Sequence, residues 1–378
     1  MSIIIFIIIL LVLVLVHEFG HFFTAKKFGI RVDEFGFGFP PKLFSFKKGE
    51  TEYSINLLPI GGFVKIFGEN GDVEDGPPLC GGPSSTVDVG RSFVNKPKWQ
   101  QAIVLFAGIF ANFLLAWFLF SIGFMTGLPT SVGAESVGYK LSNINLVVTS
   151  VLTKSPAENV GLETGDKIIS IKSGNDVVAE INPDTLKSFV LSHGNQEIEI
   201  GFTRGSLEKI NFKKMIPVTS VADGKPAIGI SMDMIGTAKL PFFVAFWEGM
   251  RLNWSVTKGT TVGLYTLISD GIKGKGSFTA VMGPVGMVGI VGDAYQFGFV
   301  YLLSFAALIS INLAIINLLP FPALDGGRLF FLLIEKIKGS RINPKFANAA
   351  NMIGFSLLIF LMLIITYRDV VSCFKIKR

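Results

Sequence analysis

The stretch IIIFIIILLVLVLVHEFGHFFTAKK, from Ile3 to Lys27, carries His17, Glu18 and His21 near the end of a long apolar run. A helix needs about 20 mostly apolar residues to cross a membrane, a length reached here only if His17, Glu18 and His21 lie within the span. A secretory signal peptide is disfavoured because no basic residue precedes the run and no small-residue cleavage site follows it. Ionisable groups inside a bilayer are costly and usually functional, so the stretch predicts a span that carries a site.

His17-Glu18-Phe19-Gly20-His21 follows the pattern HExxH. Residues four positions apart share a helix face, so both imidazoles can bind one metal ion, and Glu18 can transfer protons beside them. Since the chain has 3 histidines, chance would give this pattern on the order of once in a thousand such chains. A pair of buried structural histidines is disfavoured because burying them in a span is expensive. The pattern therefore predicts a zinc site.

A catalytic zinc site has three protein ligands and one open position. The remaining histidine, His193, lies in a segment of soluble composition. Thr24 and Lys27 occupy the positions where the longer metzincin pattern has glycine and histidine. We therefore expect the third ligand to be a carboxylate.

Asp325 follows an uncharged run, within NLLPFPALDGGRL at residues 317–329. Two prolines break the helix before it, and two glycines after it let backbones approach closely. A broken helix at membrane depth is tolerated where it is buried or lines a cavity, so Asp325 is the expected third ligand. Glu50 and Glu52 are the competing ligands, and capping of a cytoplasmic helix is the structural alternative for Asp325.

The composition is that of a membrane protein. Half of the residues are hydrophobic (50%) and 16% are charged, against about 25% charged residues in soluble domains. The 2 cysteines argue against a disulfide-stapled scaffold, and the high hydrophobicity argues against a disordered chain. The net charge of +6 comes without a dense basic patch, so we expect no nucleic-acid partner.

Further apolar runs at residues 102–128, 294–324 and 345–368 predict about four membrane helices in all. The positive-inside rule then places both termini outside the cytoplasmic membrane and the loops 26–101 and 328–345 in the cytoplasm. The predicted fold is a polytopic α-helical membrane protein with a membrane-associated β-hairpin region and an inserted extracytoplasmic α/β domain. Its expected parts are an N-terminal membrane domain at 1–128, an extracytoplasmic region at 129–240, an amphipathic or re-entrant connector at 241–293 and a C-terminal membrane domain at 294–378.

Several shorter segments have readable local patterns. Residues 53–67, YSINLLPIGGFVKIF, predict a hairpin of two apolar strands around PIGG, and residues 36–46 are similar. Such hairpins would aggregate in the cytosol, so we expect them to dip into the membrane beside the spans. Residues 70–90 are turn-rich and predict a flexible loop. Residues 242–268 predict an amphipathic surface helix or a connecting helix, and residues 276–292 predict a re-entrant or surface segment.

SPAENVGLETGDKIISIKSG, from Ser155 to Gly174, predicts a short helix, a turn and a strand that begins at Lys167. Its Pro-Ala, Gly-Leu and Gly-Asp spacing resembles a PDZ domain, at about residues 145–235. That resemblance implies binding of an extended peptide at a sheet edge. A small α/β module without a peptide ligand is the alternative.

HExxH in the first span, the PDZ-like insert and NLLPFPALDGG near the end of a later run together resemble the site-2 protease family of intramembrane zinc metalloproteases. The bacterial regulator of sigma-E protease branch is the most similar, and GFGFPPKLFSF and MGPVGMVGI extend the resemblance along nearly the whole chain. The resemblance implies one catalytic Zn²⁺ with Asp325 as its third ligand, and substrate contacts at Asn317 and Pro320. The chain departs from many members by Gly108-Ile109 in place of Gly-Pro, and from some members by one visible PDZ domain instead of two.

The expected function is therefore zinc-dependent cleavage within or near the spans of single-span membrane proteins, such as anti-sigma factors or signal-peptide remnants. Glu18 is the expected catalytic base, and the PDZ-like domain is expected to admit only trimmed substrates. An inactive peptide-binding scaffold is the first rival, and the intact Glu18 and Asp325 argue against it. An ion transporter is the second, and it would need more polar residues along the second and fourth spans than Asn112 and Ser356.

Overall fold

A computed structural model describes residues 1–69, 90–133, 139–205, 209–222, 224–274 and 282–376. The predicted flexible loop at 70–90 lies almost wholly outside the described residues. The chain divides into two compact units. The membrane unit comprises Met1–Phe120, Gly249–Gly292 and Ser304–Arg378, and the sheet unit comprises Ser121–Glu248 and Asp293–Leu303.

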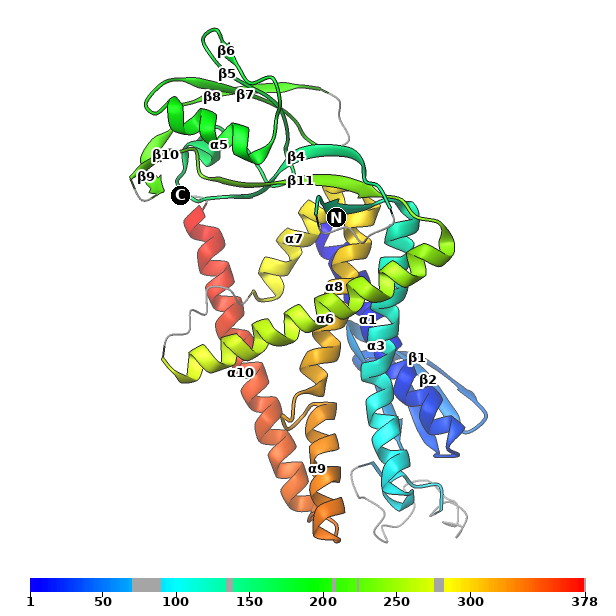
Figure 1. Cartoon of the computed structure of the whole chain (residues 1–378). Helices are drawn as coiled ribbons and strands as arrows, with labels where there is room; N and C mark the ends of the chain where they lie inside the picture. The colour runs from blue at the N-terminus through cyan, green and yellow to red at the C-terminus, as the bar shows by residue number, and fades with distance from the viewer. Residues whose placement is uncertain (70–89, 134–138, 206–208, 223, 275–281, 377–378) are drawn as a thin grey trace. The chain divides into compact units, whose positions relative to one another are not determined.

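Within the described ranges, four helices are long and apolar enough to cross a membrane. Their outward-facing side chains include large exposed residues such as Phe110, Phe118 and Phe360, as expected for surfaces that face lipid. The third apolar run splits, because α8 ends shortly before Pro320, which cannot donate a backbone hydrogen bond to the helix. The four helices are α1 (Ser2–Lys27), α3 (Lys98–Thr126), α8 (Phe299–Leu318) and α10 (Pro344–Ile376) (Figure 1).

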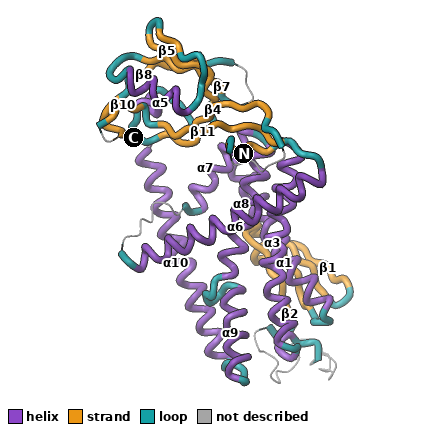
Figure 2. Tube along the Cα trace, in the orientation of Figure 1, coloured by secondary structure: helices purple, strands orange, loops and turns teal. Residues whose placement is uncertain are grey.

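The strands β1 (Val32–Lys48) and β2 (Thr51–Ile66) pair antiparallel and form the only extensive β-structure of the membrane unit among its described residues (Figure 2). The N-terminal part of β1 has partners in both halves of β2, since Phe35 lies opposite both Tyr53 and Val64. The two halves of β2 therefore pair with β1 and not with each other. This corrects the predicted hairpin at 53–67: PIGG has the composition of a turn, but it only bends β2, with Gly61 at a φ of 102°.

Helices α1 and α3 approach closely because glycines face the contact. A Cβ atom at Gly20 of α1 would lie 2.8 Å from the carbonyl carbon of Ala107, and one at Gly108 of α3 would lie 2.6 Å from Cε1 of His21. Both separations are below ordinary van der Waals contact, so neither position has room for a side chain. This contact holds the middle of α3 against the histidine-bearing turn of α1.

Three more helices longer than ten residues lie among the described residues. The segment predicted to be a surface or connecting helix forms α6 (Phe242–Ile272). Of the predicted re-entrant or surface segment, residues 276–281 lie outside the description, and the part from Pro284 onward belongs to α7 (Pro284–Phe297). Asp369 of α10 accepts hydrogen bonds from the amides of Gly283 and Gly286 at 2.9 and 3.0 Å, which fixes the start of α7. Helix α9 (Asp325–Lys338) follows the break after α8.

The sheet unit is built on a seven-stranded sheet of order β3-β11-β4-β5-β7-β8, with β6 paired to β5. The predicted local elements of residues 155–174 are present: Ser155 caps α4 (Pro156–Asn159), and β5 begins at Lys167. The hydrophobic core of the sheet unit includes Leu146, Ile171 and Ile200, which are all nearly inaccessible to solvent. The other elements are β3 (Leu128–Ser131), β4 (Ser142–Val151), β5 (Lys167–Ser173), β6 (Asp176–Val177), α5 (Pro183–Ser192), β7 (Ile198–Thr203), β8 (Asn211–Met215), β9 (Val218–Ala222), β10 (Lys225–Ala227) and β11 (Ile230–Ala238).

Candidate metal centre

Helix α1 brings the two histidines of HExxH to one buried position. His17 and His21 are 8% and 6% exposed, in a helix whose lipid-facing side chains are far more exposed. Their Nε2 atoms lie 3.2 Å apart, as the spacing of four residues on one helix face predicts. The two imidazoles therefore present nitrogen lone pairs to one point.

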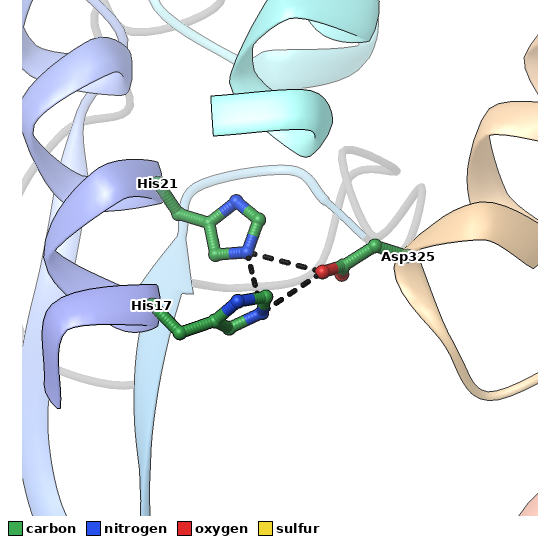
Figure 3. Close-up of side chains that lie close together, drawn as sticks. All are labelled: His17, His21 and Asp325. Carbon is green, nitrogen blue, oxygen red and sulfur yellow. Dashed lines mark hydrogen bonds and ion pairs between the residues drawn. The ribbon is translucent and has the colours of Figure 1, made fainter. Parts of the chain in front are cut away.

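Asp325 reaches the same point from the first turn of α9 (Figure 3). Its Oδ2 atom lies 3.0 Å from Nε2 of His17 and 3.3 Å from Nε2 of His21. Zinc binds imidazole nitrogen and carboxylate oxygen at about 2.0–2.2 Å, and a tetrahedron of that size has edges of about 3.3–3.6 Å. The three separations come close to that length, so the residues present fit a zinc ion with little movement.

The chain between α8 and α9 is shaped to place Asp325. Ala323 has a φ of 78°, and its amide donates a hydrogen bond to Oδ1 of Asn351 at 3.2 Å. A Cβ atom at Gly327 would lie 2.6 Å from the carbonyl carbon of Phe321, and one at Gly326 would overlap the backbone of Leu318 and Leu319. Only glycine permits α9 to begin so close to the end of α8. The glycine pair after the aspartate thus has a geometric role.

Glu50 and Glu52, the other carboxylates expected as a possible third ligand, form ion pairs with basic side chains instead. Glu50 forms ion pairs with Lys26 at 2.6 Å and with Arg91 at 2.7 Å. Hydrogen bonds from Arg91 and from Lys26 lower the pKa of Glu50 to about 2, although partial burial of the carboxylate acts in the opposite direction. Glu52 pairs with Lys42 at 2.8 Å. Asp325 makes no capping hydrogen bond in α9, whose N-cap residue is Leu324.

His193 lies in the sheet unit at the end of α5, where it stacks on Phe189 with ring centroids 4.1 Å apart. Its Nδ1 lies 2.9 Å from the carbonyl oxygen of Phe189. These contacts are those of a structural histidine. In the part of the chain that the structure describes, one group of three histidine, cysteine or acidic side chains lies close enough to share a metal ion. It consists of His17, His21 and Asp325.

The cluster opens into a cavity of about 240 Å³ that Glu18 also lines. Strand β2 contributes Phe63, Val64 and Ile66 to its wall, so a strand lies directly against the site. A Cβ atom at Gly62 would lie 3.4 Å from Cγ of Glu18, which places this part of β2 in contact with the HExxH turn. The cavity therefore has room for a water molecule and for part of an extended peptide beside the carboxylate of Glu18.

Two charged residues of the cavity wall were missed by sequence reasoning. Arg328 of α9 forms an ion pair with Glu69, just beyond β2, and both line the site. The same pair and Leu105 also line a second cavity of about 460 Å³. Arg328 follows Asp325 by three residues and so shares its helix face, but nothing in the sequence connected it with Glu69.

The two residues implied to contact substrate lie at different places. Asn317, in the last turn of α8, has its Nδ2 atom 3.5 Å from Nε2 of His17, at the edge of the cluster. Pro320 lies in the break between α8 and α9 and is not among the described residues that line the cavity. Asn317 thus lies beside the metal-ligating cluster, while Pro320 lies in the chain break away from it.

The sequence matches Peptidase family M50 over residues 5–361. A Clostridium perfringens protein with a zinc metalloprotease name is 36% identical over 360 residues, which cover 95% of each chain. The Bacillus subtilis regulator of sigma-W protease RasP is 30% identical over 448 residues, which cover 99% of each chain. Zinc metalloprotease RasP of Geobacillus kaustophilus is 29% identical over 442 residues, covering 99% of this chain and 98% of that protein.

Proposed function

Because the chain belongs to Peptidase family M50 and is a zinc metalloprotease of the site-2 type, we propose that it hydrolyses peptide bonds within or near the membrane span of single-span membrane proteins. The observation that carries the proposal is the convergence of three metal-ligating atoms beside Glu18, with two of them inside a helix apolar enough to cross a membrane. A protease centre at that depth reaches bonds that lie in lipid.

His17, His21 and Asp325 hold the zinc ion through Nε2, Nε2 and Oδ2. Their mutual distances of 3.0–3.3 Å support this assignment. When bound, zinc supplies Lewis acidity toward water and toward the scissile carbonyl group. Three protein ligands leave one open position, which is the arrangement of catalytic zinc sites.

Glu18 is the general base and then the general acid. It lines the cavity next to both histidines, within reach of a water molecule in that space. It accepts the proton that the attacking water loses and returns it to the leaving amine. A single carboxylate can take both parts because the two proton transfers occur in sequence at the same side of the peptide bond.

The substrate enters as an extended strand. A membrane helix hides its scissile carbonyl groups in its own hydrogen bonds, so the segment to be cut must unwind. Within the described pairings, Phe63–Ile66 of β2 pairs with β1 alone, which leaves its opposite edge for an added strand beside the cavity. Asn317 donates a hydrogen bond to the unwound backbone, and Pro320 keeps the adjacent chain from closing into helix.

The sheet unit regulates which substrates reach the metal centre. We assign residues 145–235 to a PDZ-like domain on the extracytoplasmic side of the cytoplasmic membrane, with both termini on that side. The local elements of residues 155–174 support the fold assignment. The domain binds an extended peptide or excludes large substrates, so that only trimmed ones enter. Deletion of residues 148–231 would then allow cleavage of full-length substrates, and unchanged resistance of these substrates would contradict the gate.

The substrate class is an anti-sigma factor or the membrane remnant of a signal peptide. A relative named regulator of sigma-W protease supports the first. The test of the activity is Glu18→Gln in a membrane cleavage assay with a single-span substrate. Cleavage should disappear while one zinc ion stays bound, because the amide cannot accept the proton. Retained cleavage would contradict the role of Glu18, and loss of zinc together with cleavage would show that Glu18 acts on the metal site instead.

A further inference from the structure

Asn112 of α3 lies beside the imidazole of His17 and has no part in the proposed reaction. Its Nδ2 atom is 3.4 Å from Nδ1 of His17, and Asn112 is 1% exposed. Its backbone carbonyl oxygen accepts a hydrogen bond from Oγ of Ser310 at 2.8 Å, which fixes this turn of α3 against α8. This turn of α3, which carries Asn112, is therefore held in place beside the histidine.

The Nδ1 atoms of both histidines need hydrogen-bond acceptors. A neutral imidazole that directs its Nε2 lone pair at a metal carries its proton on Nδ1. Nδ1 of His21 lies 2.8 Å from the carbonyl oxygen of Val104, so this requirement is met for His21. For His17, the neighbouring group is the amide of Asn112, whose Nδ2 end, a donor, faces the ring. Two donors facing each other cannot form a hydrogen bond.

The amide oxygen of Asn112 also lacks a suitable hydrogen-bonding neighbour within the described ranges. Oδ1 is buried and has no hydrogen-bond partner among the described residues. The two ends of a carboxamide have nearly the same shape, and their assignment follows from the hydrogen bonds they make. A rotation of the amide by 180° places Oδ1 opposite Nδ1 of His17 and gives both atoms a partner.

We infer that Asn112 is a positioning residue: its Oδ1 accepts a hydrogen bond from Nδ1–H of His17 and so directs Nε2 of His17 at the zinc ion. This inference rests on the ligand assignment of the proposed function. It explains a stripe on α3 in which residues four apart face the histidine turn of α1. Val104 accepts from His21, Gly108 leaves room for the ring of His21, and Asn112 accepts from His17.

Asn253 of α6 provides a matched control. It is also fully buried, its Nδ2 donates to the carbonyl oxygen of Phe113 at 3.3 Å, and its Oδ1 likewise has no partner among the described residues. Asn112 and Asn253 therefore share burial and an unpartnered oxygen, and they differ in the contact with His17. A purely structural role would make the two substitutions equivalent.

The experiment measures the zinc affinity of the purified full-length chain by competition with a chromophoric chelator, without reference to activity. Asn112→Leu should weaken zinc binding by about 10- to 100-fold, as loss of such a supporting hydrogen bond does elsewhere. Asn112→Asp keeps an acceptor and should stay within about threefold of the native affinity, because carboxylates commonly support zinc-bound histidines. Asn253→Leu should leave the affinity unchanged.

Three outcomes would overturn the inference. They are native zinc affinity in Asn112→Leu, a loss in Asn253→Leu equal to that in Asn112→Leu, and a loss of more than about tenfold in folded Asn112→Asp. His17→Ala separates this inference from the proposed function. If His17→Ala binds zinc as the native chain does, the ligand assignment itself is wrong. If His17→Ala loses zinc and Asn112→Leu keeps it, the role of Asn112 alone is wrong.

Discussion

Substitution of Gly108 by alanine should disrupt the metal centre without removing any of its ligands. The added Cβ atom would lie 2.6 Å from Cε1 and 2.7 Å from Cδ2 of His21, whereas ordinary contacts begin at 3.4 Å. Nε2 of His21 would lie closer still, so the ring must move by at least the difference between 2.6 Å and 3.4 Å, about 0.8 Å. Metal sites tolerate deviations of about 0.2 Å in ligand distance, so the shift is about four times too large.

We expect Gly108→Ala to weaken zinc binding at least tenfold, which corresponds to about 1.4 kcal/mol. Cleavage at limiting zinc should fall by the same factor, because the ligand atoms no longer converge. The assay is zinc titration against a competing chelator, with the cleavage rate measured at each free zinc concentration. An unchanged affinity would refute the argument, since it would mean that α1 and α3 separate easily enough to absorb a methyl group.

Gly259→Ala is the matched control, because Gly259 lies within a helix and a Cβ atom there would meet nothing within 4 Å. Alanine at such a site should leave zinc binding unchanged and stabilise the helix by about 0.5–1 kcal/mol. If both substitutions weaken zinc binding equally, the effect of Gly108→Ala does not come from contact with His21.

Three more predictions concern other parts of the molecule. Glu50 has its folded-state pKa lowered to about 2, so its ion pairs stabilise the protein above the ordinary value of 4.5 and this contribution disappears as the pH falls toward 2. Glu50→Gln should therefore lower the unfolding temperature at pH 7, and the difference from the native chain should vanish in acid. Arg328→Glu should slow cleavage at least about tenfold. Adding Glu69→Arg should restore part of the cleavage rate, with a coupling energy of about 0.5–3 kcal/mol in a double-mutant cycle. If the second substitution does not restore the rate, the ion pair between Arg328 and Glu69 is not important for cleavage. Arg204→Leu should destabilise the sheet unit by about 3 kcal/mol in denaturant-dependent proteolysis, because Asp166 is fully buried and pairs with Arg204 at 2.7 Å. The exposed pair Lys214–Glu197 is the control, and its loss should cost less than about 1 kcal/mol.

The part of the site that sequence could predict depends on local spacing. His17, Glu18 and His21 lie within one turn or so of a single helix, so their common face follows from helix geometry. Asp325 could be identified from the sequence because the prolines and glycines around it indicate a broken helix, and because an uncharged run ends beside it. Sequence also indicated the apolar helices, because a span of about 20 residues is required in any fold that crosses a membrane.

The parts that sequence reasoning missed depend on contacts between distant segments. Gly61 belongs to a PIGG stretch with the composition of a tight turn, yet long-range pairing with β1 on both sides makes it a bend within β2. The match of Asn112 to His17 joins residues 95 positions apart, and that of Arg328 to Glu69 joins residues 259 positions apart. No local pattern reports such distances, so these roles needed the three-dimensional arrangement.

The proposed function requires the zinc centre to cut inside a membrane span. The most direct test reconstitutes the purified chain in liposomes with a single-span substrate and identifies the new peptide ends by mass spectrometry. We expect ends within the substrate's apolar span, formed by the native chain with zinc and absent with Glu18→Gln. Ends that lie only in the substrate's water-exposed segments, or the same ends formed by Glu18→Gln, would contradict zinc-dependent cleavage inside the span.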